Sequence, residues 1–136
     1  MKSNGTMMKS SIVAALGGLL FGFDTAVIAA VNAHQRTDKG FGPALGPAAA
    51  AFAIARFEAL GYSVLRGAAD WTMGADDRDM QTEILAGWTS AANETGTLPH
   101  ADTAAWLTRR RAAIAAGRSS LLVGHVDFFA TPSATR

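Results

Sequence analysis

The sequence predicts an α/β fold, and three observations lead to that prediction. The chain has 136 residues, which is enough for one domain and too few for two. Stretches with helical spacing alternate with β-prone stretches in the order loop, helix, strand, helix, helix, strand. Hydrophobic residues make up 49% of the chain and charged residues only 17%, which argues against a disordered chain.

The first helix and strand of this pattern follow a loop. Residues 32–46 are polar and glycine-rich, so they predict a loop. A helix is expected from Pro47 to Leu60, because proline is favoured at the first helical position and apolar residues then recur at helical spacing up to Gly61. The alternating residues Tyr62 to Arg66 predict a strand directly after it.

Two further helices come next. One begins at the acidic residues from Asp76 and ends at the break over residues 93–99, and the other begins at Asp102 and ends at Gly117. Residues 109–111 are all arginine and fall near the end of the second helix, where cations complement the helix dipole. We therefore expect them to form a solvated helix terminus.

The last predicted element is the run from Ser120 to Ala130. It is apolar on both faces, which is typical of a central strand with neighbours on both sides. Two strands do not make an independently stable sheet, so part of the domain is expected to be missing. Exposed apolar surface and self-association are expected to follow.

Composition excludes several functions. The chain has no cysteine, which removes disulfides, thiolate zinc sites and a cysteine nucleophile. The net charge is +1, and the one dense basic run has no interleaved aromatic residues, so no nucleic-acid partner is expected. The spacing of His, Asp and Glu predicts no metal site.

The amino-terminal segment is apolar from Ile12 to Val31 apart from Asp24, which is long enough to span a membrane if the acid is tolerated. Residues 16–28, LGGLLFGFDTAVI, resemble the start of the first transmembrane helix of sugar porters of the major facilitator superfamily. The resemblance implies a proton-coupling role for Asp24. Transport itself does not follow, because such porters need twelve spans. Three interpretations of this segment remain open: a membrane anchor or transporter relic at residues 11–31, a signal peptide cut after Ala29, or a buried helix of a soluble protein.

The remainder of the chain carries a second resemblance. Six short blocks carry it: NAHQRTDKGFGPALGP at 32–47, GY at 61–62, DW at 70–71, GW at 87–88, Trp106 with the arginines at 109–111, and VGHVD at 123–127. Through these blocks, residues 31–132 are similar to the carboxy-terminal half of a bacterial family of class I S-adenosylmethionine-dependent methyltransferases. The resemblance implies a partial Rossmann-like α/β domain. In it, residues 62–66 form the sixth strand and residues 121–130 the seventh, antiparallel and between the fifth and sixth.

The two resemblances suggest a chimeric or truncated chain, with a transmembrane-like or signal-like helix at 1–31 and an incomplete methyltransferase-like domain at 32–136. The family uses S-adenosylmethionine and transfers its methyl group to an acceptor that the sequence does not identify. The glycine-rich turn and acidic residue that bind this donor belong to the amino-terminal half of the fold and are not visible. No cofactor-binding residue is therefore predicted, and no catalysis is expected from this chain alone. We expect a cytoplasmic or inner-membrane-associated bacterial protein rather than a secreted one.

The richest polar cluster lies in the predicted loop, which the methyltransferase resemblance places on the substrate side: His34, Gln35, Arg36, Asp38 and Lys39. The two cations can orient an acidic substrate and the histidine can act as a base; the alternative is a loop fastened by an ion pair between Arg36 and Asp38.

Two other features of the chain can also be weighed as sites. His125 and Asp127 lie two apart on a predicted strand and so share a face, where they can form a hydrogen-bonded pair; the alternative is a structural core histidine. The glycines from Gly40 to Gly46 imitate a dinucleotide-binding turn. We expect a simple loop there, because no apolar strand leads into the first glycine.

Overall fold

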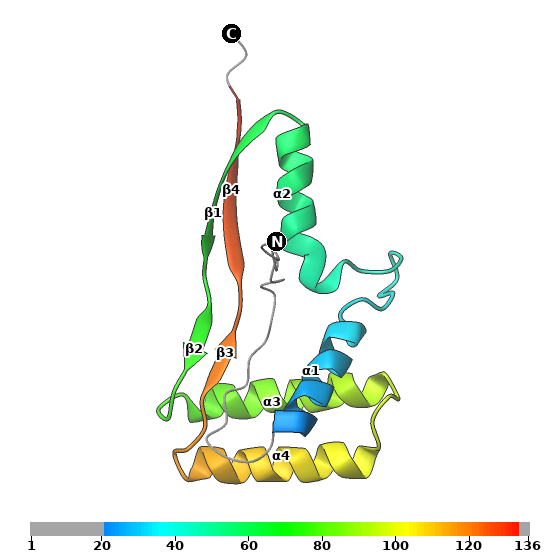
Figure 1. Cartoon of the computed structure of the whole chain (residues 1–136), viewed down its shortest axis with the longest axis vertical. Coiled ribbons are helices and arrows are strands. Elements are labelled where there is room, and N and C mark those ends of the chain that lie inside the picture. The colour runs from blue at the N-terminus through cyan, green and yellow to red at the C-terminus, as the bar shows by residue number, and fades with distance from the viewer. Residues whose placement is uncertain (1–20, 134–136) are drawn as a thin grey trace, which may run out of the picture.

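The computed structural model describes residues 21–133, and it confirms a mixed helix and strand fold. In chain order its elements are α1 (Phe21–His34), the 3₁₀ helix η1 (Gly46–Ala48), α2 (Ala49–Ala59), β1 (Tyr62–Ala68), β2 (Trp71–Met73), α3 (Arg78–Glu94), α4 (His100–Ala115), β3 (Leu121–Val123) and β4 (Val126–Pro132). Figure 1 shows a long two-stranded ribbon with α2 beside it and a group of three helices, α1, α3 and α4, at one end.

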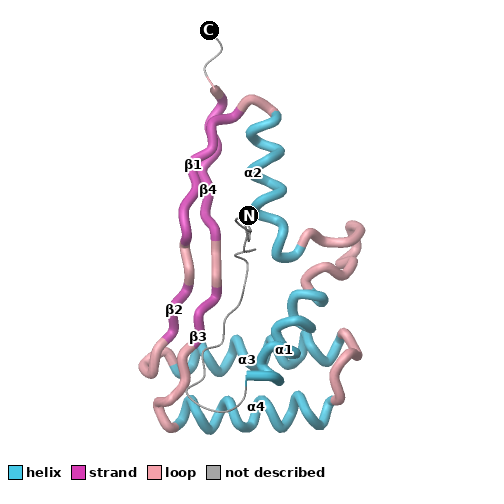
Figure 2. The backbone as a smooth tube through the Cα atoms, viewed as in Figure 1, coloured by secondary structure: helices cyan, strands magenta, loops and turns pink. Residues whose placement is uncertain are grey.

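The ribbon consists of two antiparallel ladders that follow one another, β1 with β4 and β2 with β3 (Figure 2). In the longer ladder Tyr62 pairs with Pro132 and Ala68 with Val126. The expectation of a single last strand over residues 120–130 is wrong in detail, because the chain leaves the ladder at Gly124 and His125 and so divides the run into β3 and β4. A neighbour on each side of this run is also expected; within the described residues β4 pairs with β1 on one side and with no strand on the other.

Helix α2 covers one face of the long ladder. The ring of Phe57 lies 5.3 Å from that of Tyr62 on β1 and 5.8 Å from that of Phe128 on β4, measured between centroids. The opposite face is open to solvent, since Leu65 is 74% exposed and its ladder partner Phe129 is 65% exposed. The predicted helix at residues 47–60 and the strand that follows it are thus confirmed, and so is the exposed apolar surface.

The three remaining helices form the main hydrophobic core. Val27 and Val31 of α1, Leu85 of α3 and Trp106 of α4 are all buried in one cluster, which Met73 and Leu121 extend to the short ladder. The α1 backbone runs without a break across residue 31, the boundary expected between the two parts of the chain. No helix within residues 21–133 is long and apolar enough to cross a membrane. Residues 11–20 of the apolar segment lie outside the described part of the chain.

The run of three arginines is not a uniformly solvated helix terminus. Arg109 and Arg111 are exposed, as expected, but Arg110 is only 1% exposed. The expectation is wrong for this residue because successive helical residues point about 100° apart, and Arg110 lies on the same inward face of α4 as Trp106 and Ile114.

Candidate functional site

A cleft of about 260 Å³ lies where three parts of the fold meet: the end of α1, the start of η1 and α2, and the junction between β3 and β4. Its lining includes Asn32 in the last turn of α1, Gln35 directly after α1, and His125 at the junction between β3 and β4. Gly46 and Pro47 form the wall on the α2 side. The structure therefore brings together one residue of the predicted loop cluster, Gln35, and one residue of the predicted strand pair, His125.

His125 is held in this cleft by three contacts. Its backbone N–H donates to Oδ1 of Asp70 at 3.0 Å, and its ring lies 4.5 Å from the indole of Trp71. Its Nδ1 lies 3.0 Å from the carbonyl oxygen of Val123. Because a carbonyl oxygen only accepts hydrogen bonds, Nδ1 is the donor in this contact, and a neutral ring in this tautomer has Nε2 as its acceptor. A histidine in this state can accept a proton or a hydrogen bond from a molecule in the cleft.

The expected pair between His125 and Asp127 is not formed. The partner of His125 is Asp70, which follows β1 and lies 55 residues earlier in the chain, while Asp127 is exposed on β4. The alternative of a core histidine is not what the structure shows either, since His125 is half-buried at the edge of the cleft.

The wall of the cleft depends on a close approach of the loop to η1. A Cβ atom added to Gly46 would come within 2.9 Å of Cγ of Arg36 and 3.4 Å of the Gln35 backbone. Gly46 also has a φ of +54°, a conformation that L-residues rarely adopt. Only glycine therefore lets the chain turn into η1 at this distance from the loop.

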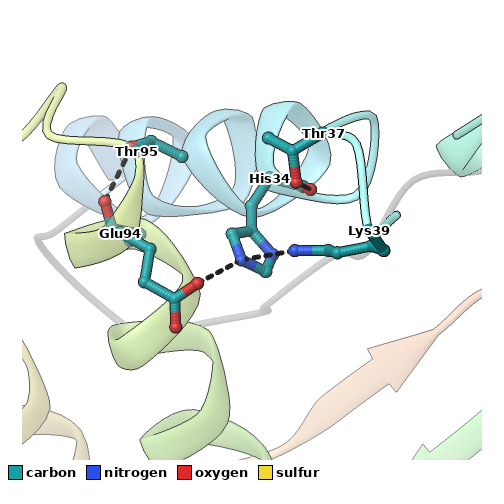
Figure 3. A network of polar contacts seen from close by, with 6 residues as sticks. His34, Thr37, Lys39, Glu94 and Thr95 are labelled. Carbon is teal, nitrogen blue, oxygen red and sulfur yellow. Dashed lines mark hydrogen bonds and ion pairs between the residues drawn. The ribbon is translucent and has the colours of Figure 1, made fainter. Parts of the chain in front are cut away.

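The rest of the predicted loop cluster is engaged elsewhere. Nε2 of His34 lies 2.7 Å from Oε2 of Glu94 on α3 and 3.0 Å from Nζ of Lys39 (Figure 3). In a neutral ring Nε2 either donates to the carboxylate or accepts from the ammonium, so only one of these two contacts is a hydrogen bond at a time. Thr37 Oγ1 donates to the His34 carbonyl oxygen at 2.7 Å and closes the turn. This network ties the end of α1 to α3, and His34 is not part of the cleft lining.

Asp38 shapes the loop rather than pairing with Arg36. Its Oδ1 accepts the backbone N–H groups of Gly40 at 2.7 Å and Gly42 at 2.9 Å, as aspartate does in turns. No ion pair between Arg36 and Asp38 is present in the described structure. The loop is therefore stabilised by the hydrogen bonds that Asp38 accepts from Gly40 and Gly42, and not by the expected ion pair. Glu94, which the sequence did not single out, is the acidic partner of the cluster; it lies 60 residues from His34, beyond the reach of local patterns.

A second polar group is buried among the helices. Asp24, the residue in the transporter-like segment, is 5% exposed, and its Oδ1 accepts the indole N–H of Trp106 at 2.6 Å. Nearby, Nη2 of Arg110 donates to Oγ of Ser119 at 3.1 Å, while its Nε and Nη1 have no partner. Burial lowers the pKa of Arg110, and the negative charge of Asp24 partly opposes that effect. Asp24 is therefore a counter-charge inside a helical core.

The glycine loop offers no cofactor cradle. Residues 40–46 follow α1 rather than a strand, so the strand, turn and helix needed for dinucleotide binding do not occur here. Within the described residues no group of three or more His, Asp or Glu side chains is placed to hold a metal ion.

No protein-family model, curated protein or solved structure matches this chain.

Proposed function

We propose that this chain corresponds to the acceptor-side, carboxy-terminal half of a class I methyltransferase-like domain, and that the described residues by themselves do not bind S-adenosylmethionine. The observation that carries the proposal is the pairing of the last strand. β4 runs antiparallel to β1 over seven residue pairs, and its other edge is unpaired in the described structure. The family resemblance calls for a last strand that is antiparallel to the sixth and next to the fifth, and the fifth strand is absent from the described elements.

The cleft supports an acceptor-side role. His125 has a fixed ring and an Nε2 that can accept a proton from a nucleophile, and the amides of Asn32 and Gln35 add donors and acceptors to the same cleft. The donor does not fit the described residues, because the glycine loop has no strand leading into it. No catalytic step is therefore assigned to this chain alone.

Calorimetric titration of the purified full chain with S-adenosylmethionine tests the missing donor site. The expected result is no measurable heat of binding and no transfer of radiolabelled methyl groups to protein or small-molecule extracts. A dissociation constant in the micromolar range would overturn the proposal that this chain does not bind the donor. A ¹⁵N spectrum of the histidine rings provides a check on the cleft, in which His125 should carry its proton on Nδ1.

The second candidate is an interaction module, favoured by the exposed apolar pair Leu65 and Phe129 on the open face of the ladder. Membrane attachment of that module through residues 11–31 receives less support, because Val27, Ala30 and Val31 of α1 are buried against the other helices. Flotation with phospholipid vesicles tests attachment. An anchored chain would float with the vesicles, whereas a helix packed as described would leave the chain at the bottom of the gradient.

A further inference from the structure

The outer edge of β4 is an open template for another strand. Around the long ladder, the N–H of Ala69 donates to the carbonyl of His125 at 3.0 Å, and the N–H of Ser133 donates to the carbonyl of Gly61 at 3.1 Å. Since bonding alternates along an antiparallel pair, odd-numbered residues of β4 direct their backbone groups toward β1 and even-numbered residues direct theirs outward. Among residues 21–133 no strand pairs with these outward groups.

Four residues of β4 direct their backbone groups away from β1, and they are suited to pairing with another strand. They are Val126, Phe128, Ala130 and Pro132, and none is charged. The first three each offer an N–H and a C=O, and Pro132 offers a C=O. The outer edge of β1 differs, because Arg66 is among its outward-facing residues, and charged side chains are the usual protection of an edge strand. The less protected edge of this ribbon is therefore that of β4, where the only blocking residue is Pro132 at the end of the strand.

The open face beside this edge is apolar at its centre. Phe129 and Leu65 face each other across the ladder and are both mostly exposed, while α2 covers the other face (Figure 1). The one charged residue of β4, Asp127, lies on the same open face, two residues before Phe129. A strand added to the edge of β4 would place its side chains directly next to this row.

We propose that the occupant of this edge is a second copy of the chain, with β4 pairing antiparallel to β4 around a two-fold axis at Phe129. This register places Phe129 opposite Phe129 of the partner subunit and forms one apolar row with Leu65 at each end. Asp127 then lies opposite the partner's Thr131, whose hydroxyl can donate to it. Phe128 and Ala130 exchange backbone hydrogen bonds with their counterparts, and Pro132 accepts at the ends of the ladder.

Charge selects this register over its neighbours. Moving the axis to Asp127 would place two carboxylates opposite each other, which is destabilising. Moving it to Phe128 would place the Asp127 carboxylate against the Phe129 ring and remove the contact between the two rings. The axis at Phe129 is the one that joins the apolar side chains while keeping each carboxylate beside a hydroxyl. This inference goes beyond the proposed function. It uses the same edge of β4 that the fifth strand of the family would occupy, so the dimer requires that edge to be free.

Single cysteines test the register, because the chain has no cysteine of its own. In the full chain, Phe129→Cys should form a disulfide-linked dimer on mild oxidation, since residues opposite each other at a non-hydrogen-bonded position bring their Cβ atoms within bonding reach. Leu65→Cys is the matched control: Leu65 is somewhat more exposed than Phe129 and lies on the same face, but it is one strand farther from the axis, so this variant should stay largely monomeric. Equal cross-linking of both variants, or cross-linking of Leu65→Cys alone, would overturn the proposal.

Sedimentation velocity tests the dimer itself. The unmodified chain should sediment as a dimer at tens of micromolar, and Phe129→Lys should shift it to monomer. Phe41→Lys should not, although Phe41 is the more exposed ring at 101%, because it lies in the loop and away from the edge. Circular dichroism of each variant confirms that the fold is retained. A monomeric unmodified chain, open-ended oligomers, or an equal effect of the two lysine substitutions would each refute pairing through β4.

Discussion

Replacing Asp24 tests whether the apolar amino-terminal helix belongs to a protein core. The carboxylate is 5% exposed, accepts a 2.6 Å hydrogen bond from the indole of Trp106, and acts electrostatically on the buried Arg110. Asp24→Asn keeps an oxygen for the indole but removes the charge. No ion pair joins the two side chains among the described residues, so the Asp24 charge acts on Arg110 at a distance and strengthens the hydrogen bond from Trp106. Hydrogen bonds to charged groups contribute about 1 kcal/mol more than neutral ones, so we expect Asp24→Asn to lower the free energy of unfolding by about 1–2 kcal/mol.

Asp24→Ala should cost more than Asp24→Asn. It also leaves the Trp106 indole N–H without an acceptor in a buried site, where an unsatisfied donor costs about 1–3 kcal/mol. The difference between the two variants therefore isolates the hydrogen bond, and the asparagine variant isolates the charge. Both values come from urea denaturation followed by tryptophan fluorescence and circular dichroism, with the slope of the transition compared to confirm that only stability has changed.

A double-mutant cycle identifies the partner of the charge. In an Arg110→Met background the Asp24 carboxylate no longer offsets the charge of a buried cation, so Asp24→Asn should cost less there than in the unmodified chain. The expected coupling between the two positions is about 0.5–1 kcal/mol. If Asp24→Asn changes stability by less than about 0.5 kcal/mol in the unmodified chain, as surface substitutions do, the Asp24 charge does not contribute to the helical core.

Two further predictions concern α2 and the cleft. Phe57→Ala should destabilise the chain by about 3 kcal/mol, since the ring joins α2 to both strands of the long ladder, whereas Phe52→Ala, on the exposed side of α2, should change the midpoint of urea denaturation little. Gly46→Ala should cost about 1–3 kcal/mol and shift the amide resonances of Gln35; Gly117→Ala has a similar positive φ but open space around it, so it should cost less. Equal losses within either pair would contradict the packing described.

The helices could be predicted from the sequence because their signals are local. Proline at residue 47, the apolar spacing that follows, and Gly61 at a φ of +82° all act within a few turns of the same helix. Strand β2 was missed, since three residues are too few to show an alternating pattern. The division between β3 and β4 was missed for another reason: the Asp70 side chain that holds the N–H of His125 lies 55 residues away.

The site residues follow the same division. The loop cluster was recognised as polar, but the sequence could not show that His34 would contact Glu94 on α3 while Gln35 would line a cleft with His125. Nor could it show that Arg110 is buried while its two neighbours are exposed. Helical geometry alone separates adjacent residues by about 100°, so one of three consecutive arginines can face the core, and tertiary packing decides which one.

The apolar segment illustrates why hydropathy alone leaves a membrane helix and a buried helix indistinguishable. Along the described half of it, the buried positions are Asp24, Val27, Ala30 and Val31, which recur at helical spacing and form a single face. The exposed positions include Thr25 and Ala29. Alanine raises the mean hydropathy of a segment but costs little when it faces water, so a run rich in alanine has the composition of a span and the burial pattern of an amphipathic helix. An acid on the buried face is then best satisfied by donors of the same protein, and the Trp106 indole provides one.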